Sequence, residues 1–212
     1  MISIVQNFVK IKSIINDDNV KIIAVSKTFS YEYIKPLVDY GHVHFGENKI
    51  QEAQMKWREI KKNQPSIKLH MIGKLQSNKA KDAVNLFDYI HSVDNLKLAK
   101  LLAQYENDIN KKLSYFIQVN IGHEPQKSGI SPDGLEDFYH YCTRDLKLNI
   151  IGLMAIPPND NKESFYFQNL MELNQSLQLK DLSMGMSGDF QEAIKYKSTF
   201  VRIGSSIFGN RD

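Results

Sequence analysis

The amino-acid sequence predicts an α/β protein with a single (β/α)8 TIM barrel, and three observations lead to this fold class. Short apolar runs rich in β-branched and aromatic residues alternate along the chain with longer stretches of helical period. Several runs, such as IIAV, FIQVNI and IIGLMAI, are apolar throughout, as expected of parallel strands covered on both faces. Eight such runs in 212 residues favour closure into a barrel, at the small end for this fold.

The expected elements follow one another in a regular order. An amphipathic helix comes first, because Ile4, Phe8, Ile11 and Ile15 recur at helical spacing. We expect strands at 21–26, 42–46, 67–72, 88–93, 113–121, 148–156, 181–186 and 199–204. Helical patterns lie between them at 31–40, 48–63, 78–87, 95–110, 131–145, 163–178 and 189–197.

Local signals bear on these boundaries and on the competing architecture. Ser131-Pro132 predicts a helix start with proline in the first turn, and Asp189 to Glu192 resemble a capping box. An open doubly wound sheet is the alternative to the barrel. It would ordinarily carry a glycine-rich turn after its first strand, and residues 27–30, KTFS, contain no glycine.

Composition narrows the class of protein. A net charge of +3 is too small an excess to indicate nucleic acid, and no apolar run approaches the roughly 18 residues of a membrane span. The one cysteine, Cys142, has no partner for an internal disulfide, and the N-terminal segment lacks the features of an export signal. We therefore expect one cytoplasmic domain over residues 1–212, monomeric with a weak dimer left open, and without nucleic-acid or membrane partners.

The first expected strand ends on a lysine, Lys27. Ile23, Val25 and Lys27 share one face of this strand, so an inward-facing Val25 would place the Lys27 amine over the barrel mouth. Most lysines at strand ends are simply at the surface with an apolar stem, which is the alternative here. An amine at the mouth, partly desolvated and beside a cation, would become a nucleophile towards an aldehyde.

The loops after the last two strands suggest a phosphate site. LSMGMS leads into Gly188-Asp189, and FVRIG leads into Ser205-Ser206. Barrels often bind phosphate at these two loops, where backbone N–H groups and hydroxyls are available. The same residues also suit ordinary turns and helix caps, but the barrel context favours phosphate. A lysine opposite a phosphate site indicates a phosphorylated carbonyl compound, either pyridoxal phosphate or a phosphorylated sugar.

Other residue patterns give weaker indications of function. His42 and His44 share a strand face without a neighbouring set of metal ligands, so we expect no metal and interpret both as core or pocket histidines. The sequence contains neither G-x-S-x-G nor a P-loop. Cys142 is expected to be buried packing, and the basic run from Lys56 to Lys62 is interpreted as a solvated helix face.

Seven segments together resemble the pyridoxal phosphate homeostasis protein family, which is related to the N-terminal domain of alanine racemase. They are AVSKT, HFGENKIQEA, LHMIGKLQSNK, VNIGHEPQKSGI, GLMAIPP, LSMGMSGDFQEAI and VRIGSSIFGNR, and they cover nearly the whole chain in order. The resemblance implies the barrel of fold type III pyridoxal-phosphate proteins. It also implies pyridoxal 5'-phosphate as cofactor, held by Lys27 as a Schiff base.

The resemblance assigns further residues to that site. Ser187 and the backbone of Gly204 and Ser205 would hold the phosphate. Arg202 would face the pyridine nitrogen. Asn48, His70 and Met184 would line the cofactor site, and Lys127 would take part in cofactor transfer.

These expectations support a cofactor carrier and regulator rather than a dedicated enzyme. The chain ends at Asp212, just after the last expected strand, so we expect the second domain that supplies a catalytic tyrosine in alanine racemase to be absent. The carrier would supply pyridoxal phosphate to apoenzymes. A weak amino-acid racemase is the alternative, and a phosphosugar lyase that uses Lys27 without bound cofactor is a third hypothesis.

Overall fold

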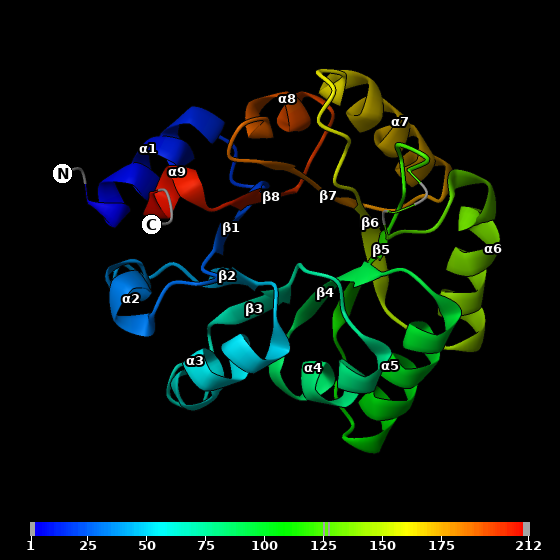
Figure 1. The fold of residues 1–212 in the computed structure, drawn as a ribbon, viewed down its shortest axis with the longest axis horizontal. Coiled ribbons are helices and arrows are strands. Elements are labelled where there is room, and N and C mark those ends of the chain that lie inside the picture. Colours follow the sequence, from blue (N-terminus) through cyan, green and yellow to red (C-terminus); the bar gives the residue numbers. More distant parts are fainter. Residues whose placement is uncertain (1–2, 125, 127, 210–212) are drawn as a thin grey trace.

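Eight parallel strands close into a barrel in the computed structural model, which describes residues 3–124, 126 and 128–209 (Figure 1). Each strand pairs with the next along the chain, and β8 returns to β1 through the register Lys21↔Phe200 to Ala24↔Ile203. The predicted barrel is confirmed, and the open sheet is excluded. The strands are β1 (Lys21–Val25), β2 (His44–Glu47), β3 (Lys68–Met71), β4 (Tyr89–Val93), β5 (Ser114–Gln118), β6 (Ile150–Met154), β7 (Asp181–Met186) and β8 (Phe200–Ile203).

Helices surround the barrel on its outer side (Figure 1). The segment between β5 and β6, expected as one helix, consists of a 3-10 turn at Pro132–Gly134, α6 and a π-helical turn at Tyr141–Asp145. The α-helices are α1 (Ile4–Ile15), α2 (Tyr31–Asp39), α3 (Ile50–Asn63), α4 (Ala80–Leu86), α5 (Leu96–Asp108), α6 (Leu135–His140), α7 (Glu163–Ser176), α8 (Phe190–Lys195) and α9 (Ser205–Phe208).

The first helix is amphipathic, as predicted. Ser3 and Gln6 form a reciprocal capping box at its start, and Phe8 and Ile11 are buried. Its side-chain amide at Asn7 donates to the carbonyl of Ile207 at 3.0 Å, so α1 packs beside α9 (Figure 1). This contact joins elements from opposite ends of the chain.

The strands alternate between the helix layer and the barrel interior. In β1, Ile22 and Ala24 pack with the helices, whereas Ile23 packs inside the barrel with Phe116 and other apolar residues. Burying one isoleucine completely is worth about 1.5–3 kcal/mol, so reversing this alternation would be costly. This alternation explains why Lys27, two residues after Val25 and four after Ile23, is expected on the inward side of the strand.

Two expected strands end earlier than their apolar runs. The runs that form β5 and β6 continue past Gln118 and Met154 into loops at the carboxyl ends of the strands. Ile156 lies in the second of these loops and lines a pocket there. Ile156 therefore borders the pocket at the barrel mouth instead of extending the sheet.

The capping box expected at the start of α8 does not form. Asp189 precedes α8 without a side-chain cap, and its carboxylate instead accepts the backbone N–H of Met186 at 2.5 Å. The preceding Gly185 has φ +90, and a Cβ there would lie 2.6 Å from the Ala193 Cβ. Asp189 thus closes the turn after β7, and Gly185, near the end of β7, occupies a position where only glycine suits the backbone.

In the part of the chain that the structure describes, no helix combines the length and the apolar character needed to cross a membrane.

Candidate functional site

A pocket of about 720 Å³ opens at the carboxyl ends of β1, β2, β7 and β8. This is the end of a parallel barrel at which ligands bind. Besides its polar residues, the pocket has apolar walls, which the sequence reasoning did not specify. Its lining consists of Val25, Lys27, Phe29, Asn48, Ile72, Ile156, Met186, Ser187, Gly188, Arg202, Gly204, Ser205 and Gly209.

Six of the residues singled out from the sequence meet in this pocket. They come from four loops or strand ends, because parallel strands bring their carboxyl termini to the same rim. The six are Lys27 after β1, Asn48 after β2, Ser187 after β7, Arg202 in β8, and Gly204 and Ser205 after β8.

The structure does not bring His70 and Met184 to the pocket lining. His70 is fully buried inside the barrel, two residues before Ile72, which does line the pocket. Met184 packs with the outer helix layer, because its neighbour Ser183 takes the inward position. The register of β7 shifts between Ser183 and Met186, and Met186 reaches the pocket in place of Met184. Lys127 lies outside the described residues.

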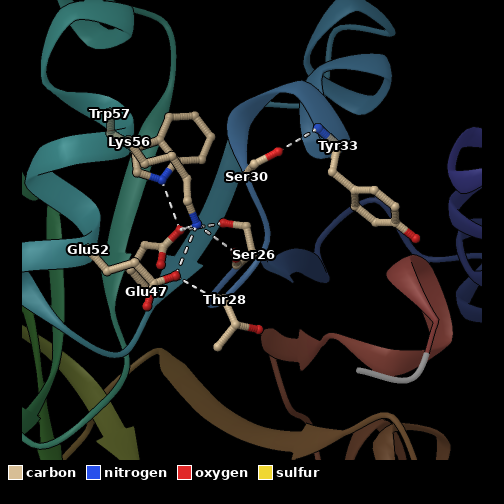
Figure 2. Close-up of polar contacts among 8 residues, drawn as sticks. All are labelled: Ser26, Thr28, Ser30, Tyr33, Glu47, Glu52, Lys56 and Trp57. Atoms are coloured by element: carbon tan, nitrogen blue, oxygen red, sulfur yellow. Dashed lines mark hydrogen bonds and ion pairs between the residues drawn. The ribbon is translucent and has the colours of Figure 1, made fainter. Parts of the chain in front are cut away.

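The segment that carries Lys27 rests on polar side chains of α3 (Figure 2). Glu47 at the end of β2 accepts from the Ser26 hydroxyl at 2.7 Å, from Lys56 Nζ at 2.9 Å and from Trp57 Nε1 at 2.9 Å. Lys56 also contacts Glu52 Oε1 at 3.2 Å. We call Ser26, Glu47, Glu52, Lys56 and Trp57 the α3 network.

The α3 network corrects one sequence interpretation. The Lys56 side chain is only 6% exposed, whereas the Lys62 side chain on the same helix is 64% exposed. The basic run from Lys56 to Lys62 is therefore not a uniformly solvated face. Lys56 begins the run on the side of α3 that packs against the barrel, where Glu47 provides its counter-charge.

The two loops expected to bind phosphate are joined by one hydroxyl. Ser187 Oγ, after β7, accepts the backbone N–H groups of Gly204 at 3.3 Å and Ser206 at 3.4 Å, both after β8. A Cβ on Gly204 would meet Val25 at 3.4 Å, an ordinary contact distance, so the backbone here is not crowded by its neighbours. Hydroxyl and N–H donors thus gather at one edge of the pocket.

Arg202 is buried at the base of the pocket, with 4% of its surface exposed. Its guanidinium donates to Ser183 Oγ and to the Ser183 carbonyl, both at 2.7 Å, and to the Ala155 carbonyl at 2.9 Å. Burial lowers the pKa of Arg202 to about 10, so it stays protonated at neutral pH. The pocket therefore has a fixed cation held by neutral oxygens.

A line of histidines runs through the barrel interior to Ser183, and we call His44, His70, His91 and Ser183 the histidine chain. His44 Nδ1 lies 2.9 Å from His70 Nε2, and His70 Nδ1 lies 2.9 Å from His91 Nε2. His91 Nδ1 lies 2.9 Å from Ser183 Oγ. Sequence reasoning missed this arrangement, although histidines at inward positions of three successive strands were the available signal.

The donor role of Arg202 assigns the proton positions along the histidine chain. Ser183 Oγ accepts from Arg202, and we infer that its single proton is directed to His91 Nδ1. His91 then carries its proton on Nε2 and donates to His70, and His70 donates from Nε2 to His44. Burial lowers the pKa values of His70 and His91 well below 6.5, so each ring is neutral and holds one proton.

Metal chemistry finds no support among the described residues. No group of three histidine, cysteine, aspartate or glutamate side chains is arranged there to hold a metal ion. The ring nitrogens of His70 face other histidines at hydrogen-bond distance. Cys142 is buried, and burial raises the pKa of its thiol to about 12, consistent with the packing role expected from the sequence.

The fold and the site define a class of protein: a closed parallel barrel with a basic pocket at its mouth. A comparison of the sequence with family models identifies the same class independently. A family model described as "Alanine racemase, N-terminal domain" matches residues 2–212. The chain belongs to this family and, within it, to the pyridoxal phosphate homeostasis proteins, which confirms the resemblance noted from the sequence motifs.

Two curated relatives show how similar the chain is to other members of this family. The chain is 41% identical over 204 residues to a pyridoxal phosphate homeostasis protein of Vibrio cholerae, covering 92% of this chain and 86% of the relative. It is 36% identical over 200 residues to a protein of the same name from Aquifex aeolicus, covering 90% and 87%. Both relatives are thus matched over most of their length.

Solved structures agree with the fold. PipY of Synechococcus elongatus PCC7942, solved with PLP bound, matches with a TM-score of 0.89 and 32% identity, covering 98% of this chain and 100% of PipY. An alanine racemase of Clostridium difficile matches with a TM-score of 0.79 and 14% identity, covering 99% of this chain and 57% of the racemase. At that identity, the racemase shows the shared barrel alone.

Proposed function

We propose that this protein binds pyridoxal 5'-phosphate at Lys27 and serves in the homeostasis of that cofactor, holding it and supplying it to apoenzymes. One observation carries the proposal: an amine, a buried guanidinium and a group of hydroxyl and N–H donors converge on a single pocket. The names of the curated relatives and the PLP-bound PipY structure support the same ligand.

The residues present fit each part of that ligand. The phosphate needs donors without steric obstruction, and Ser187, Gly204 and Ser205 supply them at the open edge of the pocket. The aldehyde needs an amine, and Lys27 is the lysine in the lining. The ring nitrogen needs a polar partner, and Arg202 would supply a fixed donor from the pocket lining.

The chemistry of attachment is reversible. Bound pyridoxal phosphate supplies an aldehyde conjugated to an electron-withdrawing ring. The Lys27 amine would condense with this aldehyde, forming one carbon–nitrogen double bond and releasing one water molecule. The reverse reaction consumes the water and frees the cofactor for transfer.

Arg202 favours holding the cofactor over using it in catalysis. A guanidinium whose pKa is about 10 donates a hydrogen bond and does not accept a proton at neutral pH. A ring nitrogen facing it therefore stays unprotonated, and the ring is a weaker electron sink than a protonated one. We place this function in the cytoplasm and in one domain that spans residues 1–212.

The attachment is tested with Lys27→Ala, with Lys49→Ala as a control lysine nearby. Wild type and the control should show the absorbance band of a lysine-bound cofactor and should yield a Lys27 peptide labelled after borohydride reduction. Lys27→Ala should lose both completely after desalting. Retention of the band in Lys27→Ala would refute the proposed attachment site, and a colourless wild type after incubation with the cofactor would favour the phosphosugar lyase.

The holding and supply role needs a separate test. Loaded wild-type protein mixed with an excess of a pyridoxal-phosphate-dependent apoenzyme should restore the activity of that enzyme as its own band disappears. Incubation with single L-amino acids, followed by chiral chromatography, should show no turnover. Racemization abolished by Lys27→Ala would overturn the carrier role in favour of the racemase.

A further inference from the structure

Both peptide groups that flank Lys27 are bonded to side chains of α3 (Figure 2). The Ser26 carbonyl, in the peptide before Lys27, accepts from Lys56 Nζ at 2.7 Å. The Thr28 N–H, in the peptide after Lys27, donates to Glu52 Oε1. Rotation of either peptide would break one of these bonds, so α3 fixes the backbone on which the Lys27 side chain is mounted.

The loop after Lys27 is held in a conformation that costs free energy. Thr28 has φ 71, in the left-handed region that a threonine seldom adopts. Ser30 caps α2 by accepting the Tyr33 N–H at 3.3 Å, which fixes the far end of the loop (Figure 2). The bond from Thr28 to Glu52 holds the strained residue between these two fixed points.

Stability alone is a poor reason for the α3 network. Glu47 is fully buried and the Lys56 side chain is 6% exposed, so both charges are removed from water. Buried ion pairs are often replaceable by apolar side chains without loss of stability. In the described residues, Glu47 Oε2 also has no hydrogen-bond partner, which adds a further cost.

We propose that Glu47, Lys56 and Glu52 are positioning residues that fix the Lys27 amine towards the cofactor aldehyde, an inference that rests on the proposed function. Glu47 anchors Lys56, Lys56 holds the peptide before Lys27, and Glu52 holds the peptide after it. The network acts on the covalent step, because none of its side chains lines the pocket.

The test separates attachment from simple binding by using two probes. Pyridoxal 5'-phosphate reports both, whereas pyridoxine 5'-phosphate has an alcohol in place of the aldehyde and reports binding alone. Lys56→Met and Glu52→Ala should weaken binding of the aldehyde about tenfold and slow its attachment, because misplacing a reacting group by a fraction of an ångström is costly. Binding of the alcohol should change by less than about twofold.

Two further variants provide controls. Lys62→Met removes an exposed lysine from the same helix and should behave as wild type with both probes. Glu52→Gln retains an acceptor oxygen for the Thr28 N–H and should restore most of what Glu52→Ala loses. Glu52, with 24% of its side chain exposed, keeps the test available if Lys56→Met does not fold.

The outcomes distinguish this inference from the proposed function. If wild type attaches the cofactor and the α3 variants attach it equally well, the positioning role fails while the function stands. If both probes weaken together, the variants loosen the pocket generally and the positioning role also fails.

If wild type does not attach the cofactor, the function itself fails. Amide hydrogen exchange of cofactor-free protein then tests the bond from the Thr28 N–H to Glu52 by itself. Exchange at Thr28 should be faster in Glu52→Ala than in Glu52→Gln. Equal exchange in these two variants would show that Glu52 does not hold the peptide after Lys27.

Discussion

Two buried polar networks support the pocket, and they differ in charge and in location. The α3 network lies between the barrel wall and α3 and pairs the Lys56 ammonium with the Glu47 carboxylate. The histidine chain lies inside the barrel, where its rings are neutral, and it ends on Arg202 through Ser183. One network supports the residue proposed to bond the cofactor, and the other supports the residue proposed to face its ring.

The difference shows how charge is distributed around the pocket. In the α3 network the Lys56 ammonium is paired locally with the carboxylates of Glu47 and Glu52, and Lys56 and Glu52 also bond to the backbone. Arg202 instead donates to neutral oxygens of Ser183 and Ala155 in the described structure. Its charge therefore remains available to a ligand, because the groups that hold it do not cancel it.

Breaking the charged network should have the largest effect on stability. Glu47→Ala leaves the Lys56 ammonium, the Ser26 hydroxyl and the Trp57 N–H without their shared acceptor. We expect it to lower the free energy of unfolding by about 3–5 kcal/mol, measured by urea denaturation. Glu59→Ala, which removes the exposed partner of Lys62, should cost less than about 1 kcal/mol. Equal costs for the two variants would contradict the assignment of Glu47 as a buried anchor.

Breaking the neutral chain should cost less and should change proton positions. Ser183→Ala removes an acceptor for Arg202 and the donor to His91, for an expected loss of about 1–3 kcal/mol. Nitrogen-15 NMR of the imidazoles should show the Nε2–H tautomer at His70 and His91 in wild type, and mixed tautomers in the variant. A wild-type Nδ1–H tautomer at either histidine would refute the direction assigned to the chain.

Two histidines at the amino-terminal end of β2 should make the free energy of unfolding sensitive to acid. Burial lowers the pKa values of His42 and His44 to about 4, and Lys21 and Lys68 lower that of His44 further, against the opposing effect of Asp88. The unfolded chain, with pKa values near 6.5, therefore binds more protons between about pH 6.5 and 4. The free energy of unfolding should fall as the pH is lowered through this window, by up to about 1.4 kcal/mol per pH unit for each histidine.

Urea denaturation at several pH values measures that slope. His42→Phe should reduce it by removing one of the four histidines whose pKa is lowered by burial, while retaining a ring against Phe8. An unchanged slope in this variant would show that protonation of His42 does not contribute to the loss of stability at acidic pH.

The fold and most of the pocket were predictable because they depend on patterns that a sequence displays directly. Alternation along β1 predicted that Lys27 would share the inward face of Ile23 and Val25, and the structure has that arrangement. The rule that parallel strands present their carboxyl ends together predicted that Ser187 and Gly204 would meet. Both inferences need only the parity and the order of the strands.

The remaining features depend on packing that no local pattern specifies. Lys56 and Lys62 lie on the same helix, and only the docking of α3 against the barrel decides which of them is buried. Met184 and Met186 are separated by a register shift at a glycine with positive φ, which strand alternation does not reveal. The histidine chain was unexpected because barrel interiors are ordinarily filled with branched apolar side chains.

The assigned direction of the histidine chain also gives the barrel an electrical polarity. Each O–H or N–H bond in the chain points away from Arg202, so the dipoles add head to tail along the interior. Their negative end lies at Ser183, next to the guanidinium, as the carboxyl end of a helix lies next to a favourable cation. The barrel interior thus stabilises a buried positive charge with aligned neutral rings.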